Sequence, residues 1–185
     1  MYLIIGLGNP EEEYAKTRHN MGFDTINKIA SKYNIALNKK KFDAIYGDAI
    51  INGEKVILVK PQTYMNLSGV SVRQFVNFYK IPMENLIVIY DDMDIDKGII
   101  KIRKKGGPGN HNGMKSVEKE IATGDFARIR IGIGTPEYKN DMINYVIGNV
   151  SEEEYEILQQ GVEKAAEAVI DILENGIDHA MNRYN

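Results

Sequence analysis

Polar side chains suited to chemistry follow the first apolar segment of the chain. Residues 2–5 read Tyr-Leu-Ile-Ile, a pattern typical of a short buried strand, and a glycine-containing turn at 6–8 follows. Glycine lets the backbone turn sharply and leaves room for a ligand. Asn9, Tyr14 and His19 come next, and histidine is the side chain best suited to proton transfer near neutral pH. The segment predicts a strand and turn that present these side chains at one edge of a sheet.

The same turn admits a second interpretation as a dinucleotide site. The Gly-x-Gly of residues 6–8 begins the dinucleotide fingerprint, but Glu11 stands in place of the third glycine. Two further glutamates follow it, and their charge would repel a pyrophosphate. Asn9 and Pro10 instead predict the start of a helix, because asparagine caps helices and proline suits their first turn.

A second polar segment, residues 60–69, follows an apolar stretch and precedes an expected helix. Asn66 offers both a donor and an acceptor to a ligand. Tyr64 and Met65 would form an apolar floor beside it, and Ser68 is expected to cap the helix. A loop asparagine beside a buried methionine, without any functional role, is the alternative interpretation.

Acidic residues follow the most apolar segment, residues 86–90, which has the composition of a central buried strand. A calcium loop of the EF-hand type that began at Asp92 would need glycine at its sixth position and glutamate at its twelfth. Lys97 and Arg103 occupy those positions, so the sequence excludes this loop.

Two interpretations of the acidic segment remain open. In the first, Asp91, Asp92 and Asp94 act with His19 in a metal-dependent phosphohydrolase. In the second, Asp91 alone faces a histidine, fixes its tautomer and leaves the other ring nitrogen basic.

A glycine-rich loop over residues 104–112 leads into another expected helix. Such a loop at a helix N-terminus is a natural anion site, and the absence of Gly-Lys-Ser/Thr excludes a Walker A loop. Asn112 stands at the helix opening, either as a simple cap or as a ligand-binding residue. Serine nucleophiles are disfavoured because no Gly-x-Ser-x-Gly motif occurs.

Composition describes a globular chain of 185 residues, with 43% hydrophobic and 26% charged residues and a net charge of -3. No cysteine is present, which excludes disulfides and thiolate chemistry. No apolar run approaches the roughly 20 residues of a membrane helix, and no signal peptide is recognised, so a cytoplasmic location is expected. Basic residues gather at 101–105, and Arg128 and Arg130 alternate with isoleucines, which predicts a local positive patch.

Hydrophobic periodicity predicts an α/β fold: a single domain over residues 1–185, with a twisted mixed, mostly parallel β-sheet and helices on both faces. Strands are expected at 2–6, 45–51, 55–60, 86–90, 99–103 and, half exposed, 127–133; helices are expected near 21–33, 68–79, 112–122 and 152–175. Asn52-Gly53 predicts a hairpin. Ser151 with Glu154 predicts a capping box, and Gly176 a helix end. The apolar face of the last helix is interpreted as core, which favours a monomer.

Taken together, these segments resemble the bacterial-type peptidyl-tRNA hydrolase family from end to end. The motifs that carry the resemblance are Gly6–Pro10, Tyr14, Thr17–Gly22, Pro61–Gly69, Asp91–Asp94, His111–Lys115 and Arg128–Gly134. Each motif alone is weak, whereas their order and spacing together are specific. One departure is Asn110, which stands where the family usually has the second of two glycines before His-Asn-Gly.

The resemblance implies hydrolysis of the ester that joins a peptide to tRNA, which recycles tRNA after premature release from ribosomes. It implies peptidyl-tRNA as the partner, and neither a metal nor an organic cofactor. By this resemblance His19 is the general base, Asp91 orients it, and Asn9 contacts the substrate. The implied substrate-binding residues are Tyr14, Tyr64, Met65, Asn66 and Asn112, and the implied tRNA phosphate contacts are Arg103, Lys104, Lys105 and Arg130. Two alternatives to a peptidyl-tRNA hydrolase remain: the metal-dependent phosphohydrolase described above and a non-enzymatic RNA-binding module.

Overall fold

All seven strands form one sheet in the computed structural model, which describes residues 1–185 apart from the side chain of Lys139. The strands are β1 (Tyr2–Gly6), β2 (Lys39–Lys41), β3 (Ala44–Ile51), β4 (Glu54–Pro61), β5 (Leu86–Asp92), β6 (Ile100–Arg103) and β7 (Ala127–Gly132), in the order β2-β3-β4-β1-β5-β7-β6. The central strands β4, β1, β5 and β7 run parallel, and the outer pairs are antiparallel. The predicted mixed sheet is confirmed.

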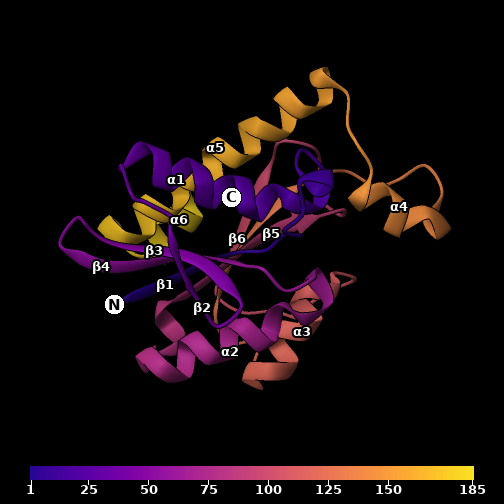
Figure 1. Cartoon of the computed structure of the whole chain (residues 1–185). Helices are drawn as coiled ribbons and strands as arrows, with labels where there is room; N and C mark the ends of the chain where they lie inside the picture. The colour runs from indigo at the N-terminus through magenta and orange to yellow at the C-terminus, as the bar shows by residue number, and fades with distance from the viewer.

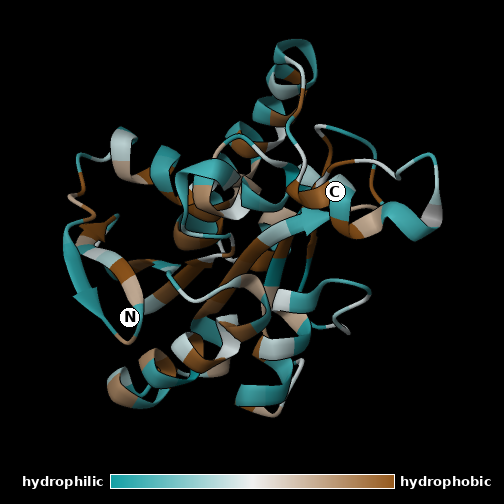
Figure 2. Cartoon of the chain, turned by 45° about the vertical axis from the view of Figure 1, so that its right-hand side comes forward, coloured by the Kyte–Doolittle hydropathy of each residue, from teal (hydrophilic) through white to brown (hydrophobic). Residues whose placement is uncertain are grey.

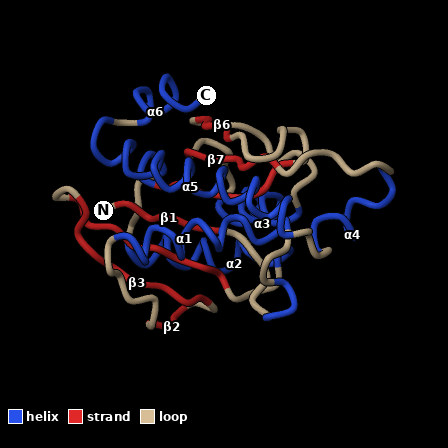
Figure 3. Tube along the Cα trace, turned by 90° about the horizontal axis from the view of Figure 1, so that it is seen from above, coloured by secondary structure: helices blue, strands red, loops and turns tan.

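Helices cover both faces of the sheet, as the sequence predicts (Figure 1). One face carries α1 (Met21–Lys32), α5 (Glu152–Asn175) and α6 (Ile177–Tyr184), and the other carries α2 (Ser68–Tyr79) and α3 (Asn112–Ile121). The short helix α4 (Met142–Ile147) lies apart from both layers, beyond the carboxyl ends of the central strands (Figure 3). No helix among the described residues combines the length and apolar character needed to cross a membrane.

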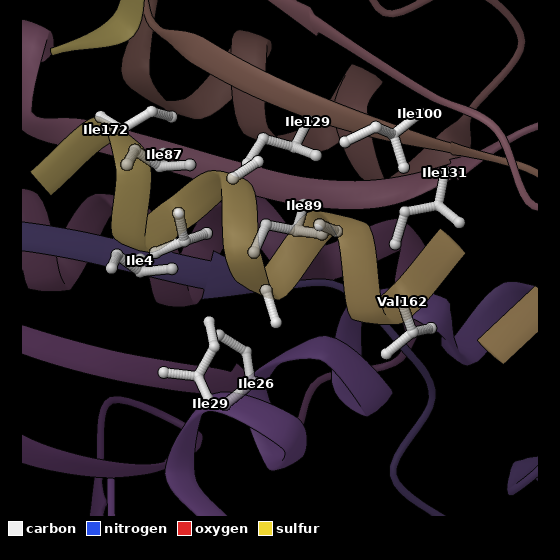
Figure 4. Packing of buried hydrophobic residues seen from close by; sticks show 14 of the residues in the cluster. Ile4, Ile26, Ile29, Ile87, Ile89, Ile100, Ile129, Ile131, Val162 and Ile172 are labelled. Carbon is white, nitrogen blue, oxygen red and sulfur yellow. The ribbon is translucent and has the colours of Figure 1, made fainter. Parts of the chain in front are cut away.

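Alternating side chains of the central strands build two apolar layers. Ile4 of β1 and Ile89 of β5 pack toward α1 and α5, where they meet Ile26 and Val162 (Figure 4). Leu3 and the other strand residues whose side chains point to the opposite face of the sheet pack toward α2 and α3. The central strands are accordingly hydrophobic, while the helices alternate hydrophobic and hydrophilic residues (Figure 2). Each fully buried isoleucine contributes about 1.5–3 kcal/mol through removal from water.

The predicted hairpin and helix end are confirmed, and the predicted capping box is present only in its serine half, because the Glu154 carboxylate pairs with Arg18 and Lys97. The hairpin between β3 and β4 turns at Asn52 and Gly53, and both residues have positive φ, 51° and 80°. The hydroxyl of Ser151 accepts the N–H of Glu154 at 3.1 Å and caps α5. Gly176 ends α5 with a φ of 88°.

Other local predictions are wrong, for physical reasons that the structure shows. Ser68 does not cap α2; it is the first residue of that helix, and its hydroxyl donates to the carbonyl of Met65 at 2.7 Å. No α-helix begins at Asn9 and Pro10; the chain instead forms 3-10 turns at Glu12–Tyr14 and Arg18–Asn20. Strand β7 is buried rather than half exposed, because it lies between β5 and β6.

Candidate active site

His19 and Asp91 meet at the carboxyl ends of neighbouring strands. His19 lies in the turn that leads from β1 to α1, and Asp91 lies near the end of β5, which pairs with β1. The Nδ1 atom of His19 is 3.0 Å from both carboxylate oxygens of Asp91. Both residues are buried, with 8% and 3% of their surfaces exposed. A carboxylate placed in this way fixes the imidazole tautomer and leaves Nε2 as the basic atom.

A second histidine shares the same carboxylate. Nε2 of His111 is 3.0 Å from Oδ1 of Asp91, and the rings of His19 and His111 are 4.8 Å apart between centroids. His111 precedes α3 and caps it, because its Nδ1 accepts the N–H of Met114 at 3.1 Å. Since Nδ1 accepts, the proton of a neutral His111 is on Nε2 and points at Asp91.

Burial and the two histidines act in opposite directions on the pKa of Asp91. Burial raises this pKa, but the charges and hydrogen bonds of His19 and His111 outweigh it and hold the pKa well below its usual range. Burial lowers the pKa of His111, and attraction to Asp91 opposes this without reversing it. The site at neutral pH therefore contains an ionised Asp91 and a neutral His111.

Asn9 is held by a pair of reciprocal amide contacts that local sequence rules do not reveal. Its backbone N–H donates to Oδ1 of Asn20 at 2.8 Å, and Nδ2 of Asn20 donates to the Asn9 carbonyl at 3.0 Å. The side-chain Oδ1 of Asn9 accepts the N–H of Met65 at 2.9 Å, so it cannot act as a helix cap. These three hydrogen bonds join the turn after β1 to the turn after β4. Because Oδ1 of Asn9 already accepts, the group that remains for a ligand is its side-chain NH2, which donates.

A cleft of about 360 Å³ opens beside the two histidines. Among the residues predicted for the site, His19, Asp91, Asn112 and Arg130 line this cleft. The alternative interpretation of Asn112 as a simple cap is excluded, because Asn112 is the exposed first residue of α3 and His111 caps the helix. The cleft is also lined by His111, by the loop residues Gly107–Asn110, and by Met142, Ile143 and Val146 of α4.

The remaining substrate-binding candidates lie outside the residues that line the cleft. Met65 is buried, while Asn66 and Tyr64 are exposed in the turn before α2. The hydroxyl of Tyr64 donates to a carboxylate oxygen of Glu11. Tyr14 is partly buried in the turn after β1. The structure thus brings His19 and Asp91 together, whereas Asn9, which contacts Asn20 and Met65, is not among the residues that line the cleft, and Tyr64 and Asn66 lie exposed.

The neighbouring acid, Asp92, is engaged elsewhere. One of its oxygens accepts from Nη1 of Arg130 at 3.1 Å, and the other accepts the N–H of Asp94 at 2.8 Å. The set of Asp91, Asp92, Asp94 and His19 that the sequence suggested for metal binding is therefore not the one that the fold gathers. The fold gathers His19, Asp91 and His111, whose potential ligand atoms lie within 4.8 Å of one another. Two imidazoles and a carboxylate can hold a zinc ion.

The predicted basic residues occupy different environments. Arg103, Lys104 and Lys105 are exposed at the end of β6 and in the loop after it, and Lys104 pairs with Asp178 of α6 at 2.5 Å. Arg128 does not belong to an exposed patch, because it is 1% exposed. Its guanidinium donates to the carbonyls of Gly107 and Gly124. From its buried position it therefore stabilises the glycine-rich loop.

The sequence motif contained His111 but gave it no role. Histidine is an unusual cap, and its partner Asp91 is 20 residues away in the chain. The only signal available was its place in a glycine-rich loop that follows a buried strand. Asn110 keeps a negative φ, whereas its neighbour Gly109 has a φ of 57°, so the glycine that the family has at position 110 is not needed for this turn.

Comparison with known proteins places this geometry in a family. The family model described as peptidyl-tRNA hydrolase matches residues 3–185. The chain is 54% identical to the peptidyl-tRNA hydrolase of Caldanaerobacter subterraneus subsp. tengcongensis and 53% identical to that of Alkaliphilus metalliredigens, and both matches cover 100% of each chain. The crystal structure of peptidyl-tRNA hydrolase from Acinetobacter baumannii matches with a TM-score of 0.95 and 39% identity, over 100% of this chain and 94% of that one. The chain therefore belongs to the peptidyl-tRNA hydrolase family.

Proposed function

We propose that His19 is the general base with which this chain hydrolyses peptidyl-tRNA, a carboxylic ester. The observation that carries the proposal is the buried contact between Nδ1 of His19 and Asp91 at the wall of the cleft. Nε2 of His19 takes a proton from water as the water oxygen attacks the ester carbonyl. The tetrahedral intermediate then expels the ribose oxygen, which receives that proton. General-base assistance of this kind accelerates a reaction by about 10²–10⁴-fold.

Asparagine amides supply the hydrogen bonds that this mechanism needs. Asn9 is rigidly framed, and its NH2 group suits contact with the peptide next to the ester. Asn112 lines the cleft next to His111 in the chain, and Asn66 stands at the turn after β4. An amide that donates to the developing oxyanion is worth about 10²–10³-fold in rate. We assign Asn9 to catalysis together with His19 and Asp91.

The tRNA end is proposed to lie across the surface around the cleft. Tyr14, Tyr64, Met65, Asn66 and Asn112 would contact the acceptor end and the peptide, and the exposed Arg103, Lys104, Lys105 and the cleft residue Arg130 would contact phosphates. We propose that the chain works as a monomer, because the apolar face of α5 is buried against its own sheet. A cytoplasmic location fits the role of recycling peptidyl-tRNA that leaves the ribosome prematurely.

The proposal is tested by following release of amino acid from N-acetyl-phenylalanyl-tRNA and from phenylalanyl-tRNA. We expect rapid release from the blocked substrate and at least tenfold slower release from the free one, because Asn9 recognises a peptide-like amide; tenfold corresponds to about 1.4 kcal/mol. Equal rates on the two substrates would contradict the assignment of Asn9.

The same assay decides whether His19, Asp91 and His111 work as metal ligands. The enzyme is assayed after EDTA treatment and again after addition of Zn²⁺. The general-base mechanism predicts unchanged release after EDTA, because water is activated by Nε2 of His19. Loss of release that Zn²⁺ restores would instead show a metal-dependent hydrolase built on the same three residues.

A further inference from the structure

Arg18, the residue before His19, contacts two elements that are distant in the sequence. Its Nε and Nη2 atoms donate to the two carboxylate oxygens of Glu154 in α5, at 3.1 and 2.9 Å. Nη1 donates to the carbonyl of Tyr145 in α4 at 2.8 Å, and the guanidinium stacks on the Tyr145 ring at 3.9 Å. The Arg18 and Glu154 side chains are only 12% and 15% exposed. We call this group, Arg18, Glu154 and Tyr145, the Arg18 latch.

The latch attaches a helix that the hydrophobic core holds only in part, because Tyr145 and Val146 are half-buried against the core beneath α1 and α5. None of the six residues of α4 is buried, and a helix of six residues is not stable by itself. Apart from the Arg18 contacts, the Tyr145 hydroxyl donates to the carbonyl of Ile133 at 2.6 Å, and Thr17 forms a single backbone bridge with Asn149. Lys97 adds a second cation to Glu154 at 3.0 Å. The position of α4 therefore depends on this partial packing and on the polar contacts of Tyr145, and Arg18 makes two of those contacts, to its carbonyl and to its ring.

The same helix forms an apolar wall of the catalytic cleft. Met142, Ile143 and Val146 line it, facing the polar groups contributed by Asp91 and Asn112. Ile143 is 69% exposed, so it presents apolar surface to the cleft that it lines. An apolar side chain of the amino acid esterified to tRNA would cover this surface.

We propose that Arg18 is a positioning residue that holds α4 as the apolar wall for the amino acid next to the scissile ester. This inference rests on the proposed function. Arg18 acts through Glu154 and Tyr145, and not through His19, although the two residues are adjacent. Asp91 lies in β5, and His19 and His111 are held by hydrogen-bond contacts to its carboxylate and not by α4, so the latch governs substrate affinity and not the chemical step.

The test compares Arg18→Gln, Glu154→Gln and the double variant with the parent enzyme. For N-acetyl-phenylalanyl-tRNA we expect KM to rise about fivefold to tenfold in each single variant, with kcat within about twofold of the parent. The double variant should show no further rise, because both changes break one latch. N-acetyl-glycyl-tRNA should show little change, since glycine has no side chain to meet Met142, Ile143 and Val146. Arg18→Lys should restore the parent KM only in part, because lysine cannot make the bidentate contact.

Two further measurements separate the latch from a general loss of structure. Amide hydrogen exchange of residues 142–147 should accelerate in both single variants, while exchange in the middle of α5 stays at the parent rate. Arg73→Gln is the matched control, because Arg73 forms an ion pair with Glu120 at 2.7 Å between α2 and α3; it should leave KM unchanged. An unchanged KM in both latch variants would overturn the proposal, as would a loss of kcat in Arg18→Gln alone. Failure of the parent to release N-acetyl-phenylalanine would instead refute the proposed function.

Discussion

At the scale of single residues, the site depends on one carboxylate that serves two imidazoles. Asp91 is almost fully buried, and burial alone would favour its neutral form. The contacts to His19 and His111 at 3.0 Å reverse that preference and keep it ionised. Burial keeps His111 neutral, so only one of its ring nitrogens carries a proton. That nitrogen is Nε2, which donates to Asp91. The two histidines thus have different tasks, although they bind the same carboxylate.

The neutral state of His111 makes stability depend on pH. Because its pKa is lower in the folded protein, the unfolded chain takes up a proton first as the pH falls. The free energy of unfolding should therefore decrease below about pH 6.5, by at most about 1.4 kcal/mol per pH unit for one proton. Asp91 adds a separate loss of stability only below about pH 4, the ordinary range of its pKa, since its folded pKa is depressed.

Urea unfolding at pH 7, 6 and 5 measures this contribution in the parent and in His111→Asn. Asparagine can still accept the Met114 N–H but does not titrate. The variant should lose less stability between pH 7 and pH 5 than the parent does. Identical slopes in the two proteins would contradict the prediction, because they would mean that folding does not change the pKa of His111.

The family resemblance predicted the pairing of His19 with Asp91, but nothing in the sequence predicted that His111 contacts the same carboxylate. His19 and Asn9 could be assigned from the motif around the first strand. Asp91 and Asp92 are adjacent acids of the same type, and only the fold shows that Arg130 takes Asp92 and leaves Asp91 for His19. Successive strand residues point to opposite faces, so a shift of one position in the assignment would exchange their roles.

At the scale of elements, α1 lies directly against the turn that carries the site. The Cβ of an alanine at Gly22 would collide with the carbonyl of Ile89 and the amide of Leu7. The backbones of α1, β1 and β5 therefore meet without side chains between them at this point. The close approach fixes His19, three residues earlier in the chain, against Asp91 of β5.

Gly22→Ala should force α1 away from the sheet and lower the free energy of unfolding by about 1–3 kcal/mol, the usual cost of overpacking. Turnover should fall with it, because His19 moves away from Asp91. Urea denaturation and ester release at saturating substrate measure the two effects.

The control for this variant is Gly107→Ala in the glycine-rich loop. A Cβ at Gly107 meets no atom within 4 Å, and its backbone is not left-handed. Its free energy of unfolding should stay within about 0.5 kcal/mol of the parent. Equal stability of Gly22→Ala and the parent would mean that α1 can shift without cost.

Elements with a strong local pattern were predictable, and elements set by distant contacts were not. The central strands were recognised because buried parallel strands are continuous apolar runs. The 3-10 turns between Glu12 and Asn20 were mistaken for a helix start, since the Asn9–Asn20 pairing replaces a cap. Strand β2 consists of three lysines and pairs at the sheet edge, where charge rather than hydrophobicity is usual. The short helix α6 was also not predicted.

At the scale of the whole molecule, charge is distributed unevenly. The net charge is -3, yet Arg103, Lys104 and Lys105 are exposed together after β6. The buried Arg128 shows that a basic residue in the sequence is not necessarily part of a positive surface. Sequence charge counts could therefore predict a basic region but not its members.

Arg103→Ala should weaken binding of tRNA and flatten its salt dependence. Loss of one phosphate contact reduces the slope of log K against log salt concentration by about 0.9. Lys55→Ala is the matched control, because Lys55 is exposed near the start of β4, at the end of the sheet opposite the cleft. Fluorescence anisotropy measures the binding of tRNA to both variants at about 50 to 200 mM KCl, a range over which phosphate contacts change the affinity strongly. Equal slopes for Arg103→Ala and the parent would remove Arg103 from the tRNA surface.

The central claim, that Nε2 of His19 activates the water, is tested most directly by single-turnover hydrolysis with His19→Ala. The variant and the parent are mixed in excess over N-acetyl-phenylalanyl-tRNA, and binding is measured on the same samples. We predict that the rate falls by about 10²–10⁴-fold, while the affinity for tRNA stays within about threefold, because the phosphate contacts are intact. A hydrolysis rate near that of the parent, at full tRNA binding, would contradict the assignment of His19 as the general base.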